Sequence, residues 1–150
     1  MTVTENALEI AAPAAAIYGL AAATERWPAL LPHYRFVRVL DERGATRVVE
    51  MGAWRHVFPI RWTAEQINDP DAPAIRFRHV RGWTRGMDVE WRFTPLGPDR
   101  TRVTIVHRLE FAFPIAAEWL GRHVVGDYFI DGVATQTLAR MKLLAERSER

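Results

Sequence analysis

The sequence predicts an α+β fold in which an antiparallel sheet of about seven strands wraps around one long C-terminal helix. Strand-like segments recur at hairpin spacing from Tyr34 to Phe113. A helical pattern of ~25 residues follows, from about His123 to Arg147, and spans about 37 Å. Two short helical segments come after a first, weaker strand. A strongly twisted sheet with one apolar face closes by wrapping around such a helix.

The N-terminal part predicts one strand and two short helices. Weak alternation favours a strand from roughly Val3 to Ile10. Pro13 is tolerated in a first helical turn, and the alanine-rich AAAIYGLAAA that follows has high helix propensity. Trp27-Pro28 breaks this helix, and Pro32 limits the next helical segment to a short turn.

The strands that follow are bounded by turn residues. YRFVRVLD leads through Gly44 into TRVVEMGAWRHVF, a plausible hairpin, and IRWTAEQI comes after Pro59. The turn-rich segment from Asn68 to Pro73 precedes IRFRHVR, MDVEWRF and RVTIVHRLEF. Helical periodicity then returns, and one face carries small and apolar residues: Gly126, Ile130, Val133, Ala134, Thr137, Met141 and Leu144.

The last three strands carry ionisable residues in their apolar stripe. Strict alternation places His79, Arg81 and His107 on the same side as the large apolar residues. Such groups are costly to bury without partners, so this face is either solvated or lines a cavity with polar spots. The small residues of the helix leave room for a cavity. We therefore expect the protein to hold a small, mostly apolar molecule.

Composition narrows the function classes. The chain has 150 residues, which favours one domain over 1–150, and no cysteine, which fits a reducing cytoplasm. We see no charged-then-apolar leader and no long apolar run, so we expect neither a signal peptide nor a membrane span. The net charge is only +2 with scattered basic residues, so we expect a solvated sheet face and not a nucleic-acid surface. The histidines lack metal-ligand spacing and no phosphate loop occurs, so we expect neither a metal nor a cofactor.

The element order and two segments resemble a known superfamily. A strand, two short helices, six strands and a long helix form the helix-grip fold of START domains, birch-pollen-allergen-like proteins and polyketide aromatase/cyclases. AAPAAAIYGLAAATERWPALLPHY and LARMKLLAER resemble the two ends of single-domain aromatase/cyclases of the tetracenomycin type. The resemblance implies that Trp27 and Tyr34 line a cavity. It departs at IRWTAEQ, where Gln66 stands in place of a cavity arginine.

These observations support two hypotheses. The first is a carrier or sensor whose cavity holds a lipid, quinone or polyketide; the second is an aromatase/cyclase that closes rings on a substrate delivered by an acyl carrier protein. For an enzyme, His79 is the expected base and Arg81 or Tyr34 the oxyanion donor. Simpler interpretations are half-buried histidines, a solvated arginine and a core tyrosine. The predicted ligand-binding residues are Trp27, Tyr34, Trp62, Gln66, Phe77, His79, Met87, Trp91, His107, Ile130 and Thr137.

Overall fold

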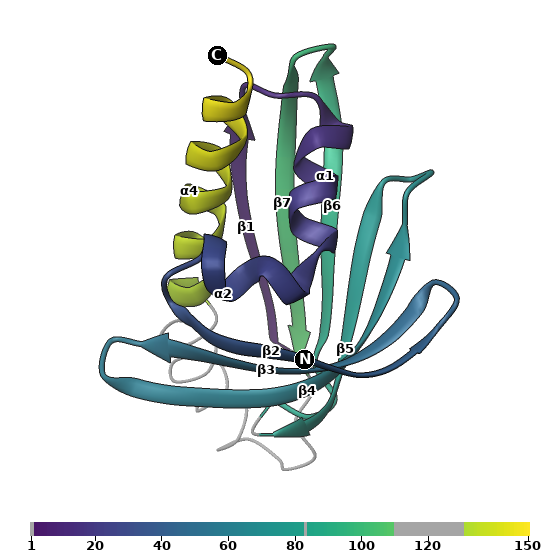
Figure 1. The fold of residues 1–150 in the computed structure, drawn as a ribbon, viewed down its shortest axis with the longest axis vertical. Coiled ribbons are helices and arrows are strands. Elements are labelled where there is room, and N and C mark those ends of the chain that lie inside the picture. The colour runs from purple at the N-terminus through teal and green to yellow at the C-terminus, as the bar shows by residue number, and fades with distance from the viewer. Residues whose placement is uncertain (1, 83, 110–130) are drawn as a thin grey trace.

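The computed structural model describes residues 2–82, 84–109 and 131–150 (Figure 1). Within them, seven antiparallel strands form one sheet in the order β1-β7-β6-β5-β4-β3-β2. The elements are β1 (Thr2–Ile10), α1 (Ala14–Ala22), the 3-10 turn η1 (Thr24–Arg26), α2 (Trp27–Leu30), β2 (Tyr34–Arg43), β3 (Thr46–Arg55), β4 (Phe58–Asp69), β5 (Ala74–Gly82), β6 (Asp88–Gly97), β7 (Arg100–Leu109) and α4 (Asp131–Ser148). The fold class expected from the sequence is confirmed.

Pro13 acts as the sequence predicts, whereas Trp27-Pro28 does not end the first helix, which already stops at Ala22. Pro13 stands before α1, and its carbonyl accepts the backbone N–H groups of Ala16 and Ile17. Pro28 lies in the first turn of α2, where its missing N–H costs no helical hydrogen bond. The Trp27-Pro28 pair therefore starts the second helix, and η1 separates it from α1.

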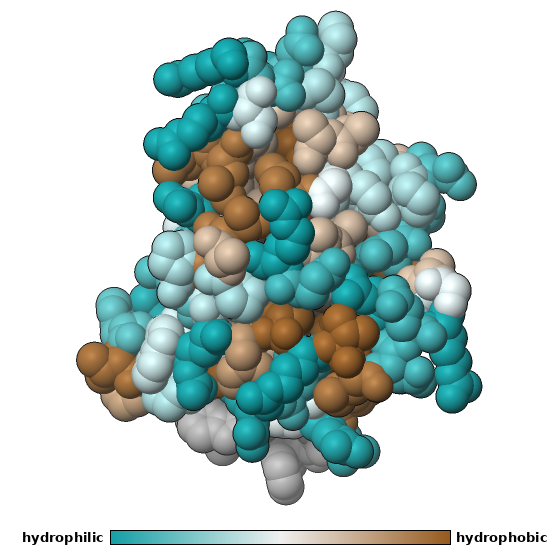
Figure 2. Space-filling model, viewed as in Figure 1, coloured by the Kyte–Doolittle hydropathy of each residue, from teal (hydrophilic) through white to brown (hydrophobic). Residues whose placement is uncertain are grey.

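The sheet curves around the helices. In Figure 1, α4 and α1 lie in front of the sheet, where α4 contacts β1 and α1 contacts β6, while β2, β3 and β4 cross beneath them. Apolar side chains are visible between α4 and α1 on this face, within a mostly polar surface (Figure 2). The buried core lies between the concave side of the sheet and these helices.

The helix α4 presents the predicted face to the sheet over the part that the structure describes. Ala134, Thr137 and Met141 are buried, whereas Leu144, expected on the same face, is half-buried. The first part of the expected helix, including Gly126 and Ile130, lies outside the described residues. None of the described helices is long and apolar enough to cross a membrane.

Candidate functional site

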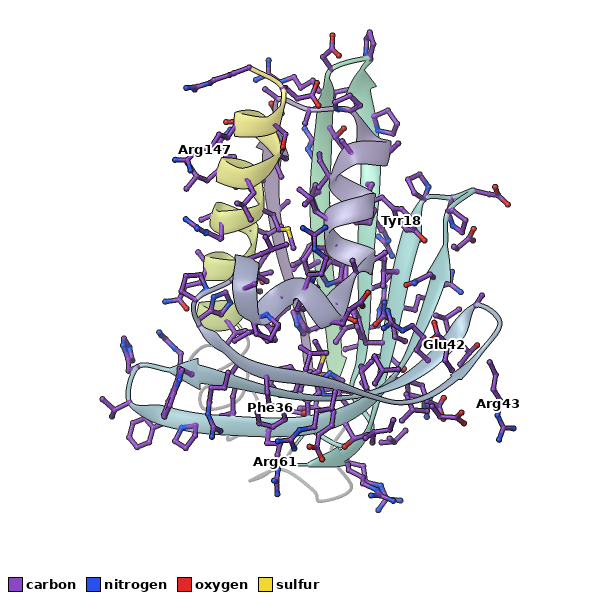
Figure 3. All side chains as sticks on the ribbon, in the orientation of Figure 1. Tyr18, Phe36, Glu42, Arg43, Arg61 and Arg147 are labelled. Carbon is purple, nitrogen blue, oxygen red and sulfur yellow. The ribbon has the colours of Figure 1, made fainter. Side chains whose placement is uncertain are left out.

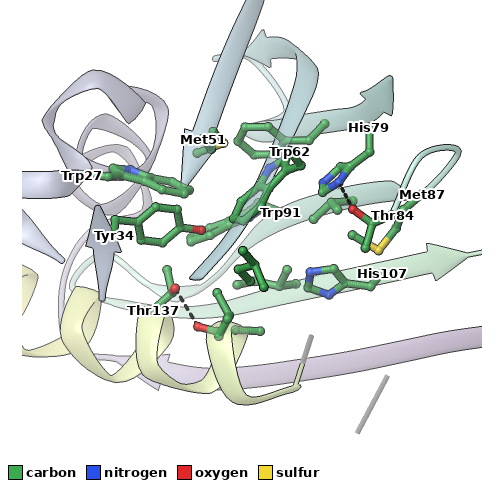
Figure 4. A pocket seen from close by; sticks show the side chains of 16 residues that line it. Trp27, Tyr34, Met51, Trp62, His79, Thr84, Met87, Trp91, His107 and Thr137 are labelled. Carbon is green, nitrogen blue, oxygen red and sulfur yellow. Dashed lines mark hydrogen bonds between the residues drawn. The ribbon is translucent and has the colours of Figure 1, made fainter. Parts of the chain in front are cut away.

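A pocket lies between the concave side of the sheet and α4 (Figure 4). The space open to the centres of water molecules is about 90 Å³. Nine of the predicted ligand-binding residues line it: Trp27, Tyr34, Trp62, Phe77, His79, Met87, Trp91, His107 and Thr137. The other lining residues were not among the predicted ligand-binding residues: Met51, Ile60, Thr84, Val89, Ile105, Val133 and Ala134.

Aromatic rings form one wall of the pocket. Trp27 packs edge-on against Tyr34, with ring centroids 5.0 Å apart, and tilts against Trp91 at 5.6 Å. Phe77 completes this cluster at 6.2 Å from Trp27. The cluster forms because α2 places Trp27 over the concave face at the point where β2 begins with Tyr34. Such rings offer flat, apolar contact surfaces to a bound molecule.

One group of hydrogen bonds joins the start of β2, with the preceding His33, to α4. His33 Nε2 and Thr137 Oγ1 are 2.8 Å apart, and the Thr137 hydroxyl donates to the carbonyl of Val133 at 2.8 Å. Because that hydroxyl has a single proton, its oxygen accepts from the Nε2–H of His33. Tyr34 also bonds Thr137. Burial raises the pKa of Tyr34, a rise that the Thr137 bond opposes, and burial lowers the pKa of His33 to about 4.

A second polar group lies across the pocket, around His79. The imidazole is 6% exposed, its Nδ1 lies 2.6 Å from Thr84 Oγ1, and its ring stacks on Trp62. Two backbone hydrogen bonds of 2.9 Å, from His79 N–H to Met87 and from Gly86 N–H to His79, fold the turn back over the strand. Burial, and less strongly the nearby His107, lower the pKa of His79 to about 3.

Arg81, which was expected in the cavity, does not line it. β5 carries one extra residue, Val80, between the pairs Ala64–His79 and Thr63–Arg81. Such a bulge reverses the side to which the following residue points. Arg81 is therefore exposed and lines a neighbouring pocket together with Arg61, whose side chain points away from the helices in Figure 3.

Gln66, which was also expected to line the cavity, is fully buried but is not among the lining residues. Its Oε1 accepts the hydroxyl of Thr24 at 2.7 Å. Its Nε2 donates to the carbonyl of Ala22 at 3.0 Å and to Asn68 Oδ1 at 2.8 Å. Gln66 thus ties the end of α1 to the sheet, because a buried amide must satisfy both its donor and its acceptor.

Thr84 is the functional-site residue that sequence reasoning missed most clearly. The segment Gly82-Trp-Thr-Arg-Gly86 predicts only a turn. The one feature that could have indicated a role for Thr84 is its hydroxyl group, close in sequence to a strand that carries a histidine. Ile130 lies outside the described residues. Within the described ranges, no three His, Asp or Glu side chains gather as a metal site.

The sheet, α4 and the pocket together define a helix-grip protein with a pocket between the sheet and the helix. Residues 10–125 match the family described as polyketide cyclase/dehydrase and lipid transport. The chain is 32% identical over 111 residues to the granaticin polyketide synthase bifunctional cyclase/dehydratase of Streptomyces violaceoruber. It therefore belongs to the polyketide cyclase/dehydrase and lipid transport family. The match to the granaticin protein covers 73% of the chain but only 34% of that relative.

Solved structures share the fold. The Zhui aromatase/cyclase from Streptomyces sp. R1128 superposes with a TM-score of 0.85 at 22% identity, covering 99% of this chain and 96% of that one. A protein from Thermus thermophilus superposes with a TM-score of 0.82 at 23% identity, covering 99% of this chain and 100% of that one. At these identities the likeness establishes the fold alone.

Proposed function

We propose that this protein binds a small planar ring system, of the polyketide or quinone type, in the pocket between the sheet and α4. The observation that carries this proposal is the pocket wall, where Trp27, Trp62 and Trp91 surround a small space. Flat aromatic walls with a few polar groups are typical of sites for ring-shaped ligands.

A second candidate function is ring closure and dehydration, with an acyl carrier protein delivering the substrate. The granaticin relative, named as a bifunctional cyclase/dehydratase, favours it, as does the presence of Tyr34 and His79 in one pocket. Two findings weigh against the catalytic set expected from sequence. Arg81 lies outside the pocket, and the low pKa of His79 makes it a weak base near pH 7.

A thermal-shift screen with a cavity-filling variant tests the binding proposal. Naphthoquinones and polycyclic phenols should raise the melting temperature, because a ligand that binds only the folded state stabilises it. Ala134 is 4% exposed and lines the pocket, so Ala134→Leu should abolish the shift. Ala139→Leu, on the exposed side of the same helix, should retain it. If quinones, phenols and lipids all leave the wild-type melting temperature unchanged, the binding proposal is wrong.

A further inference from the structure

The described side chains that line the pocket lack carboxylate, ammonium and guanidinium groups. Among the described residues, none of the lining side chains is an aspartate, glutamate, lysine or arginine. The arginines of the neighbouring strands, such as Arg76, Arg78 and Arg92, are exposed instead. The polar side-chain atoms available to a ligand therefore belong to hydroxyl groups, imidazole rings and the indole N–H groups of the tryptophans, and the N–H of Trp27 is buried with no partner among the described residues.

The two most enclosed titratable groups of the pocket are neutral at pH 7. Burial raises the pKa of Tyr34 and lowers that of His79 to about 3, so neither carries charge. Their hydrogen-bonding capacity is also partly used, since Thr137 bonds Tyr34 and Thr84 lies 2.6 Å from His79. Neither group can supply the positive charge that an anion needs on leaving water.

His107 on β7 is the other titratable group of the described lining. The remaining elements around the pocket, α2, β3, β4, β6 and α4, contribute no titratable side chain to it among the described residues. Among the described lining residues, His107 is therefore the group whose contribution a test must separate from protonation of the ligand.

We infer that the pocket selects uncharged ring systems and rejects their anionic counterparts, the aryl carboxylates and phenolates. This inference rests on the proposed function and specifies its ligand class. An ionised carboxylate loses its hydration on burial and is compensated only by pairing with a cation or by several good donors. A neutral carbonyl, amide or phenol loses far less, and a single hydroxyl or imidazole N–H can replace its lost water.

A matched pair of probes tests this selection. 2-Naphthamide and 2-naphthoate have the same ring and nearly the same shape, but only the second is an anion at pH 7. Calorimetric titration of the wild-type protein should show the amide binding at least about a hundredfold more tightly, a difference of about 2.8 kcal/mol. Equal affinities for the two probes would overturn the selection while supporting the binding proposal. Absence of binding by both would overturn the two proposals together.

A change of pH provides a second test of the selection for uncharged ligands. Between pH 7 and pH 5 the affinity for naphthoate should rise by about tenfold per pH unit, because the neutral acid becomes more abundant as its pKa is approached. The affinity for naphthamide should stay constant, because His79 stays neutral over this range. The rise in naphthoate affinity should persist in His107→Gln. Naphthamide binding by that variant shows that its pocket is intact. If the rise disappears in that variant, the pocket recruits anions through His107 and the inference is wrong.

Discussion

The indole of Trp62 lies flat against the imidazole of His79, with ring centroids 5.6 Å apart and an angle of 7° between the planes. Trp62 pairs with Gly82 across the β4–β5 ladder, and His79 pairs with Ala64. Because Gly82 has no side chain, the indole can lean along the strand over His79. One face of the imidazole is thus covered and one edge is bonded to Thr84, which keeps the ring dry and neutral.

The neutral state of His79 predicts a loss of stability in mild acid. Above pH 6.5 neither the folded nor the unfolded state protonates this ring, so it contributes no pH dependence. As pH falls below 6.5 the unfolded chain gains a proton, whereas the folded protein does so only near pH 3. The free energy of unfolding should fall by up to about 1.4 kcal/mol per pH unit from this group. Urea denaturation at pH 7, 6 and 5 measures it.

Two variants isolate the contribution of His79. His79→Gln should show a shallower decline than the wild type, because only the half-buried imidazole of His33 then remains to be protonated on unfolding. His56→Asn is the matched control, since His56 is exposed and has a φ of 55°, a conformation that asparagine tolerates. The control should decline as the wild type does. An equally steep decline in His79→Gln would contradict the assignment.

Thr137 is expected to stabilise the junction of β2 and α4 through its hydroxyl. Thr137→Val keeps the shape but leaves the His33 donor without its acceptor and removes the bond to Tyr34, so unfolding should become easier by about 1–3 kcal/mol. Thr137→Ser retains the hydroxyl and should lose less. Combining Thr137→Val with Tyr34→Phe should cost less than the sum of the two single changes, and strictly additive losses would contradict a direct bond between them.

Alternation along the strands predicts the pocket well where pairing is regular. Phe77, His79, Trp91 and His107 were expected on one face, and all four line the pocket. At Arg81 the alternation predicts the wrong side of the strand. The extra residue Val80 reverses the side of the strand, and a bulge has no distinct pattern of apolar and polar residues.

Long-range partners are the other property that the sequence does not reveal. Gln66 does lie on the inner side of β4, but the Thr24 hydroxyl that it accepts comes from a segment 42 residues earlier in the chain. Thr84 lies in a turn whose fold-back over His79 depends on two backbone hydrogen bonds. Neither arrangement follows from periodicity, because both depend on how separate elements pack in three dimensions.

The bonds of Gln66 predict a structural role with no direct effect on the pocket. Gln66→Leu should lower the free energy of unfolding by about 1–3 kcal/mol, because the Thr24 hydroxyl and the Ala22 carbonyl lose a buried partner. Adding Thr24→Val should recover part of that loss, since it removes one of the unpaired groups. Chemical denaturation measures both effects. A ligand affinity that falls in Gln66→Leu while stability is unchanged would show that Gln66 contacts the ligand after all.

The last prediction separates binding from catalysis. A general base works best when its pKa lies near the operating pH, whereas burial holds that of His79 near 3. With a reactive poly-β-ketone at pH 7, we therefore expect the wild type to form cyclised product no faster than the spontaneous background. His79→Gln should change ligand affinity alone.

Tyr34→Phe should likewise change only the affinity, because the Tyr34 hydroxyl lines the pocket as a hydrogen-bonding group. Arg81→Gln is the matched control, since Arg81 is exposed outside the pocket, and it should leave affinity unchanged. Chromatography of the products, beside calorimetric titration of the three variants, gives both readouts. If the wild type forms product above background, and His79→Gln abolishes it while affinity stays within about tenfold, His79 acts as a base and the protein is a cyclase. In that case Tyr34→Phe should slow turnover by about 10²–10³, the usual effect of removing one oxyanion donor.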